Sequence, residues 1–318
     1  MTDRDAFRAA ISPTAGSAGM MPTRAERSAD AHLWPSIALV TPSLNADRFL
    51  PACMSSVLDQ NYPRLQYVVM DGGSSDRSVE IIKARANELH HWTSRPDRGA
   101  YQAIADGFAM TDAEIMGWIG ADDILLPWAL RIVGGIFRDC PNVEWITTET
   151  PINIAADGLP YLTWRIPGFS KRGFRSRENS LGPNAPQFAS TIQQESTFWR
   201  RTLWQRAGAR FATDCKVAGD FELWDRFFDH AALYSIDVPL GAFRHHGAMQ
   251  KSLASRAQYV EECEAVLARH GANHVDAKAF LHRLARTAGL KLPALNGSYE
   301  SIHIIRRRPD GTFVAMVV

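Results

Sequence analysis

Two adjacent aspartates, Asp122 and Asp123, follow an apolar run with the character of a buried strand, and a helix is predicted to begin near Pro127. Neighbouring carboxylates repel each other and resist burial, so we expect a cation beside them. Carboxylate oxygens suit Mg²⁺ or Mn²⁺, which commonly hold substrate phosphates as well. The pair is therefore predicted to bind a divalent cation. For this segment alone, a solvated turn with an aspartate capping the helix is the alternative.

Two further loops carry groups that suit a nucleotide. The loop Asp71–Asp76 contains glycines, which let a backbone approach a ligand closely, and Asp71 can accept hydrogen bonds from a base or a ribose. The loop Ser94–Gly99 supplies Arg95 and Arg98, whose guanidinium groups can neutralise a diphosphate. Taken singly, each loop also has the composition of an ordinary solvated turn.

Three side chains further along the chain could act on a proton or a phosphate. Asp220 opens a predicted helix, and it is a candidate general base if it faces a cavity rather than only capping the helix. Glu195 is the competing carboxylate for this role. His246 follows His245 after the last predicted core strand and could contact the cation or the diphosphate, although adjacent histidines also occur on surfaces.

A fold must bring these groups together, and the sequence pattern up to residue 150 predicts such a fold. Short apolar runs that indicate strands alternate with segments at helical spacing, and a polar loop follows each strand. This alternation predicts a mostly parallel sheet with helices on both faces. Ligands of such sheets bind beyond the carboxyl ends of the strands, so we expect the loops to converge there. The predicted strands lie at 37–41, 65–70, around 91–93, up to 122 and at 143–148.

The composition excludes several classes of protein. The 318 residues carry a net charge of +1, which does not favour nucleic acid as a partner. The four cysteines lie far apart, a spacing that fits neither a zinc site nor a disulfide scaffold. A GxGxxG fingerprint and a GxxxxGK[ST] loop are both absent, which argues against a dehydrogenase and an NTPase.

Residues 1–34 lack the apolar block of a signal peptide and are predicted to form a flexible tail.

Beyond residue 150 the pattern changes. Residues 151–190 are rich in Gly, Pro, Ser and Arg, and residues 253–318 predict a helix followed by a hairpin that turns at 309–311. Several aromatic residues are expected in the core, although aromatic rings also suit sugar faces. They are Phe198, Trp199, Trp204, Phe221 and Trp224.

Five motifs in order, between about residue 36 and about residue 252, together resemble the inverting family 2 glycosyltransferases with the GT-A fold. The resemblance implies a Rossmann-like α/β fold, with a mostly parallel sheet flanked by helices and a C-terminal extension of helix and hairpin. It also implies a glycosyltransferase domain at 35–252, with a nucleotide-sugar half at about 35–150 and an acceptor half at about 151–252. The motifs are VTPSLN (40–45), VMDGGSSD (69–76), SRPDRG (94–99), GADD (120–123) and GDFELW (219–224).

The resemblance implies roles for individual residues. Asp122 and Asp123 resemble the metal-binding acidic motif of the family, and Asp220 resembles its catalytic base. Two positions depart from the family pattern, because Gly120 replaces a frequent aspartate and Gly219 replaces a frequent glutamate. The implied nucleotide-sugar site comprises Thr41, Pro42, Asn45, Asp71, Gly72, Asp97, Arg98, Asp122 and His246.

The implied reaction moves a sugar from a nucleotide diphosphate sugar to an acceptor hydroxyl, with a divalent cation as cofactor. The expected acceptor is a saccharide or a lipid-linked saccharide, in bacterial polysaccharide or glycolipid assembly. The expected location is the cytoplasm, with peripheral association at the inner face of the membrane. A sugar nucleotidyltransferase is an alternative, but the phosphate loop expected after its first strand is missing. A non-catalytic nucleotide- or sugar-binding module with the same fold is the other alternative.

Overall fold

A computed structural model describes residues 31–166, 168–175, 192–247, 255–270 and 302–318. Residues 31–33 form a single 3-10 turn, η1 (Ala31–Leu33), and the remaining described elements belong to one unit that begins at Trp34. The predicted tail at 1–34 therefore lies almost wholly outside the described residues. In the described parts of the chain, no helix combines the length and the apolar character needed to cross a membrane.

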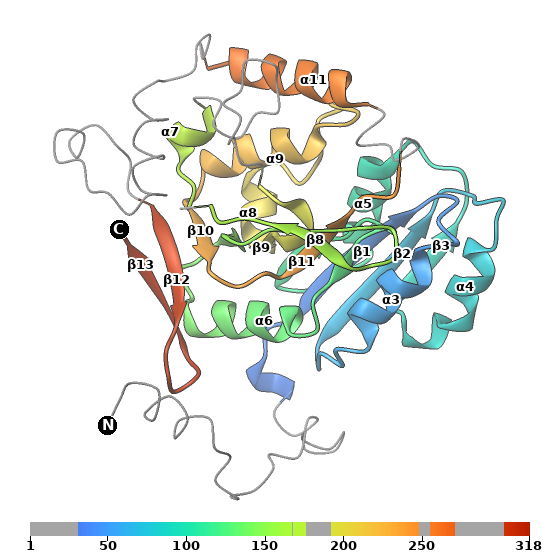
Figure 1. Cartoon of the computed structure of the whole chain (residues 1–318), viewed down its shortest axis with the longest axis horizontal. Helices are drawn as coiled ribbons and strands as arrows, with labels where there is room; N and C mark the ends of the chain where they lie inside the picture. The colour runs from blue at the N-terminus through green and yellow to red at the C-terminus, as the bar shows by residue number, and fades with distance from the viewer. Residues whose placement is uncertain (1–30, 167, 176–191, 248–254, 271–301) are drawn as a thin grey trace, which may run out of the picture. The chain divides into compact units, whose positions relative to one another are not determined.

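A nine-stranded sheet forms the centre of this unit (Figure 1). Strand β9 runs antiparallel to both of its neighbours, β13 runs antiparallel to β12, and all other neighbours are parallel. The mostly parallel sheet predicted from the sequence is therefore confirmed. In spatial order the strands are β13 (Phe313–Val317), β12 (His303–Arg307), β10 (Leu233–Ile236), β6 (Trp145–Thr148), β9 (Phe198–Arg200), β4 (Ile115–Trp118), β1 (Ile37–Ser43), β2 (Leu65–Asp71) and β3 (His91–Ser94).

Helices cover both faces of the sheet, which is why its strands are apolar on both sides. Ile37 and Leu39 of β1 pack with α3 (Leu50–Leu58), α4 (Ser78–Ala84) and α6 (Ala129–Asp139). Val40 points to the opposite face, because successive side chains of a strand alternate. That face is covered by α5 (Ala100–Ala109), α8 (Arg201–Arg206), α9 (Gly219–Phe228) and α11 (Arg256–Ala268).

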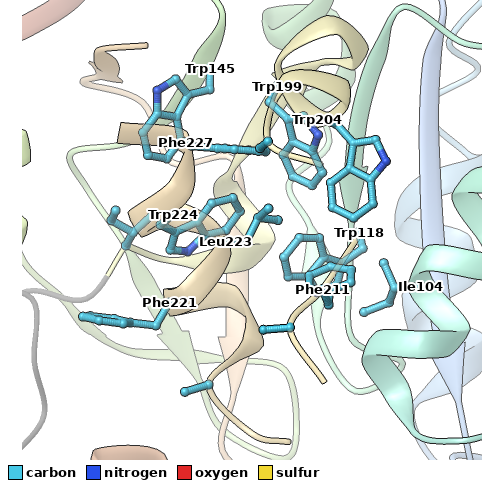
Figure 2. Close-up of a cluster of buried hydrophobic side chains, with 14 of the residues drawn as sticks. Ile104, Trp118, Trp145, Trp199, Trp204, Phe211, Phe221, Leu223, Trp224 and Phe227 are labelled. Carbon is cyan, nitrogen blue, oxygen red and sulfur yellow. The ribbon is translucent and has the colours of Figure 1, made fainter. Parts of the chain in front are cut away.

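The core on the second face is unusually aromatic. Figure 2 shows Trp224 and Phe227 of α9 beside Trp145 and Trp199, and the ring of Trp224 also stacks on Trp118 with 5.6 Å between centroids. The five aromatic residues expected in the core are all buried, so they are not exposed sugar platforms. This packing holds α9, the helix that carries Asp220, rigidly against the sheet.

A second sheet of four strands was not predicted from the sequence. Its order is β5 (Ile124–Leu125), β11 (Gly241–Arg244), β7 (Ile152–Ile154) and β8 (Pro160–Thr163). The strand expected to end at Asp122 ends at Trp118, and the helix expected near Pro127 begins at Ala129. The residues between them form β5, which pairs antiparallel with β11. This pairing brings the acidic motif against residues more than a hundred positions away.

The C-terminal region continues the main sheet. The hairpin predicted at the end of the chain is present as β12 and β13, and β12 pairs in parallel with β10. The predicted helix is α11, while residues 271–301 lie outside the described residues. The remaining short elements are η2 (Ala86–Glu88), α7 (Lys171–Gly173) and η4 (Gln194–Ser196).

Candidate active site

The loops that follow β1 and β2 are joined by hydrogen bonds at one edge of the sheet. The Oδ1 of Asn45 accepts from the amide of Ser75 at 2.9 Å, and the amide of Asn45 donates to the Oγ of Ser74 at 2.8 Å. Gly73 has a φ of 84°, and a Cβ at this position would lie 3.1 Å from the nitrogen of Pro96. The loop after β3 therefore packs directly on the loop after β2, as expected for parallel strands ending together.

A hollow of about 230 Å³ opens beside these loops. Asp97 and Arg98, predicted near the ribose and the diphosphate, both line it, together with Asp71. The Oδ1 of Asp97 accepts from the amide of Gly99 at 2.7 Å. The Oδ2 of Asp97 lies close to Gly72, and a Cβ at position 72 would be 2.9 Å from this oxygen. Cationic and anionic side chains thus share one pocket, and the other charged groups on its wall are Arg95 and Asp106.

Two residues predicted in the nucleotide site, Thr41 and Asp71, have buried side chains. The carboxylate of Asp71 accepts four hydrogen bonds, from the amides of Gly73 and Ser74 and from the hydroxyls of Ser74 and Ser94. The hydroxyl of Thr41 lies 2.9 Å from that of Tyr67, and the side chain is fully buried. Thr41 could therefore meet a nucleoside only through its backbone, while Asp71 lines the hollow. Pro42 is half-buried and is not among the residues that line the hollow.

The acidic motif contains one accessible and one buried carboxylate. The side chain of Asp122 is 33% exposed, whereas Asp123 is buried and its Oδ1 accepts from the amide of Arg244 at 2.8 Å. Burial raises the pKa of Asp123 well above its ordinary value, and the negative charges of Glu195 and Asp122 raise it further. A Cβ on Gly120 would lie 2.8 Å from Asp122 Oδ1 and 2.7 Å from Asp123 Oδ2. The space left by this glycine is where the two carboxylates converge.

Strand β11 supplies the cationic side of the motif. The Nε of Arg244 donates to the carbonyl of Asp122 at 2.6 Å, and its guanidinium is buried over the ring of Phe49. The Nε2 of His246 lies 2.9 Å from Asp122 Oδ2, so His246 adjoins the acidic motif, while its predicted contact with the cation or the diphosphate stays a prediction. Arg244 was not predicted as a site residue from the sequence. A basic residue two positions before a candidate ligand was the only signal for it.

Glu195 interacts with the acidic motif, and Asp220 interacts with Glu195. Glu195 in η4 is buried, and among the described residues its Oε1 has no hydrogen-bond partner. Burial, and then the negative charges of Asp122 and Asp220, raise the pKa of Glu195 to about 8. Glu195 therefore lies within electrostatic reach of both the acidic motif and the first turn of α9. Burial raises the pKa of Asp220 to about 6, a value suited to a base working near neutral pH.

Tyr101, at the start of α5, was not singled out from the sequence. Its hydroxyl lies 3.2 Å from Asp220 Oδ1 and 3.0 Å from the carbonyl of Val217. Its ring also fills the space beside Gly219, where a Cβ would approach the ring to 2.8 Å. The glycine in place of the family's frequent glutamate is explained by this ring.

These residues fit a divalent cation. Two carboxylates converge beside Gly120, and the buried Oε1 of the nearby Glu195 has no hydrogen-bond partner among the described residues. Burial raises the pKa of Asp123 and of Glu195, and neighbouring carboxylates raise both further, so a cation here would favour their ionised forms. In the described ranges, no three His, Cys, Asp or Glu side chains converge closely enough to enclose an ion. A cation held here would therefore complete its shell with water and phosphate oxygens, as Mg²⁺ commonly does.

Comparison with known proteins agrees with this arrangement. Residues 38–193 match the family described as glycosyl transferase family 2. The segment 38–193, just under half of the chain, belongs to that family. The match includes four of the five motifs quoted above, and the fifth, with Asp220, lies C-terminal to it.

Curated relatives are glycosyltransferases and polysaccharide-assembly proteins of bacteria. The chain is 32% identical over 97 residues to a PGL/p-HBAD biosynthesis glycosyltransferase of Mycobacterium bovis, which covers 29% of this chain and 37% of the relative. It is 28% identical over 194 residues to the O-antigen biosynthesis protein RfbC of Myxococcus xanthus, which covers 59% of this chain and 14% of the relative. The chain thus spans well under half of either relative.

Solved structures identify the fold as the GT-A type. The S. aureus TarS 1–349 complex with UDP-GlcNAc aligns with a TM-score of 0.56 at 13% identity, covering 83% of this chain and 76% of that one. The UDP complex of the same protein aligns with a TM-score of 0.56 at 14% identity, covering 82% and 74%. The fold implied by the resemblance is therefore confirmed.

Proposed function

We propose that the protein is a cation-dependent, inverting glycosyltransferase that moves a sugar from a nucleotide diphosphate sugar to an acceptor hydroxyl. One observation carries this proposal: the accessible Asp122 of the acidic motif and Asp220 in the first turn of α9 both act electrostatically on the buried Glu195. A donor-side and an acceptor-side carboxylate at one site is what a single-step sugar transfer requires. The family membership of residues 38–193 supports the same activity.

The donor nucleotide is assigned to the hollow beside Asp71, Asp97 and Arg98. Asp97 is exposed and can accept hydrogen bonds from ribose hydroxyls, while the cationic Arg98 can neutralise the diphosphate. TarS, the similar S. aureus protein, has been solved with UDP and UDP-GlcNAc, so UDP-sugars are the first donors to test.

Asp220 is assigned as the general base. As the acceptor oxygen attacks the anomeric carbon, Asp220 takes the hydroxyl proton, and the bond between that carbon and the diphosphate oxygen breaks with its electron pair going to the nucleoside diphosphate. A single displacement of this kind inverts the anomeric configuration. Such a base contributes roughly 10²–10⁴ in rate.

Asp122 and Asp123 are assigned to hold a divalent cation, and His246 is hydrogen-bonded to the Oδ2 of Asp122. When bound, Mn²⁺ or Mg²⁺ would supply positive charge against the leaving diphosphate. The chain's own part is to keep both carboxylates aligned through Arg244, which binds the backbone of Asp122 and the side chain of Asp123.

The acceptor is proposed to be a saccharide or a lipid-linked saccharide. The relatives named above act in glycolipid and O-antigen biosynthesis, and we infer a similar role in polysaccharide or glycolipid assembly. Work at the cytoplasmic side of a membrane, by peripheral association, is part of this proposal.

The experiment is a donor panel. The protein is incubated with UDP-, GDP- and dTDP-sugars and Mn²⁺, and the released nucleoside diphosphate is measured with and without saccharide acceptors. Release that acceptors accelerate supports the transferase, whereas binding without release supports a binding module.

Asp220→Asn is expected to bind donor but lose roughly 10²–10⁴ in turnover. Asp214→Asn, at a carboxylate that is 69% exposed, is the control. Full turnover in Asp220→Asn would move the base role to Glu195, which Glu195→Gln then tests.

A further inference from the structure

The first turn of α9 is held by two side chains from elements distant in sequence. The Oε2 of Glu262, on α11, accepts from the amides of Val217 and Ala218 at 2.9 and 2.8 Å. The carbonyl of Val217 in turn lies 3.0 Å from the hydroxyl of Tyr101, which also reaches Asp220. A continuous set of hydrogen bonds therefore joins α11, the Val217–Ala218 peptide, α5 and Asp220.

Helix α11, with Glu262, lies C-terminal to the segment that matches the family, whereas Tyr101 lies within that segment. Its buried Cys263, Val266 and Leu267 pack into the same core as α9. Among the described residues, the titratable groups that interact electrostatically with Asp220 are Tyr101 on α5, Glu195 in η4, and Tyr259, Glu262 and Cys263 on α11.

We propose that Tyr101 and Glu262 are positioning residues for Asp220, which hold its carboxylate toward the acceptor in both of its protonation states. The proposal rests on the assignment of Asp220 as the base. The hydroxyl proton of Tyr101 has two acceptors within reach. It bonds Asp220 while the carboxylate is ionised, and it turns to the carbonyl of Val217 once Asp220 has taken the acceptor's proton. No buried polar atom of Tyr101 is left without a partner in either state.

The two residues act on the charge of Asp220 in opposite directions. The hydrogen bond from Tyr101 favours the ionised carboxylate and lowers the pKa of Asp220, whereas the negative charge of Glu262 raises it. Glu262→Gln keeps an amide oxygen for the two backbone amides and removes the charge. It also replaces Oε1, which accepts from Gln258 Nε2 at 2.9 Å, with an NH2 group. Tyr101→Phe keeps the ring that packs against Gly219 and removes only the hydroxyl.

The test follows the carboxyl carbon of Asp220 by NMR in protein labelled at aspartate Cγ, and its resonance is the one missing from Asp220→Asn. We expect it to titrate near pH 6 in the wild type, about one pH unit higher in Tyr101→Phe and lower in Glu262→Gln. Tyr62→Phe is the matched control, because the buried Tyr62 also donates to a backbone carbonyl, that of Pro35, at 2.7 Å. It should leave the resonance unchanged.

The acidic limb of kcat/KM against pH should move in the same directions as the resonance. A resonance in Tyr101→Phe that titrates as in Tyr62→Phe, or one in Glu262→Gln that moves upward, would overturn the proposal. Because the NMR titration needs no substrate, it separates the two claims. If the Asp220 resonance shifts as expected in both variants but the protein transfers no sugar, the positioning role of Tyr101 and Glu262 stands and the proposed function is overturned.

Discussion

The Nε2 of His246 lies 2.9 Å from the Oδ2 of Asp122, although 124 positions separate the two residues in the chain. The ring of His246 also packs on Phe49, with 4.5 Å between ring centroids. One oxygen of Asp122 is thereby occupied, and the other, Oδ1, is directed toward the space beside Gly120. The pairing of β5 with β11 creates this relationship, and it orients the carboxylate before any ligand arrives.

Gly120→Ala should weaken cation binding without unfolding the protein. Its Cβ would lie 2.7–2.8 Å from one oxygen of each aspartate, so both carboxylates must turn away. Misplaced ligands commonly cost about 10-fold or more in metal affinity. Calorimetric titration with Mn²⁺ in the presence of UDP measures the change. An affinity equal to that of the wild type would show that the cation does not use these two oxygens.

Arg244→Ala should destabilise the fold by about 2–4 kcal/mol, because the buried guanidinium donates to the carbonyls of Asp122, Ala155 and Ala156 and its removal takes away all three hydrogen bonds. The carbonyl of Ala155 keeps the amide of Gly158 as a donor. Urea denaturation measures the loss. Arg77→Ala is the control, since Arg77 is 81% exposed and its ion pair with Asp47 should contribute less than about 1 kcal/mol. Equal losses in the two variants would contradict the anchoring role of Arg244.

Glu195→Gln should stabilise the cation-free protein at high pH. The pKa of Glu195 is raised from 4.5 to about 8 on folding, so the folded state binds more protons between these values and loses stability as pH rises through them. Glutamine removes this dependence. Relative to the wild type, its free energy of unfolding should rise by roughly 2–4 kcal/mol between pH 5 and pH 8.5. Urea denaturation at both pH values checks this, with the exposed Glu80→Gln as the control. A difference that does not change with pH would contradict it.

Much of the fold could be predicted because local patterns specify it. Apolar runs ending in polar loops gave the parallel strands and their common edge, and the spacing of apolar residues gave the helices. The second sheet was missed because β5 is two residues long and its pairing with β11 is purely long-range. No local pattern in the acidic motif indicates that β5 pairs with β11.

The same difference between local patterns and long-range contacts applies to the residues of the candidate site. Asp122, Asp123, Glu195, Asp220 and His246 could be proposed from residue type and motif, and the structure brings them together. Their roles remain predictions. Tyr101, Arg244 and Glu262 could not be found in this way, because their importance depends on contacts made across the chain. The glycines at 120 and 219 gain a physical explanation only when the neighbours that fill their space are known.

The most direct test of the account is the Mn²⁺ dependence of nucleotide binding. UDP, GDP and dTDP are titrated calorimetrically into the wild type, Asp122→Asn and Asp112→Asn, each with and without Mn²⁺. Asp112 is an exposed aspartate before β4, at the opposite edge of the sheet, and serves as the control. We predict that Mn²⁺ strengthens binding of one nucleotide at least 10-fold in the wild type and in Asp112→Asn, and that Asp122→Asn loses this gain. Undiminished Mn²⁺-dependent binding in Asp122→Asn would contradict the account.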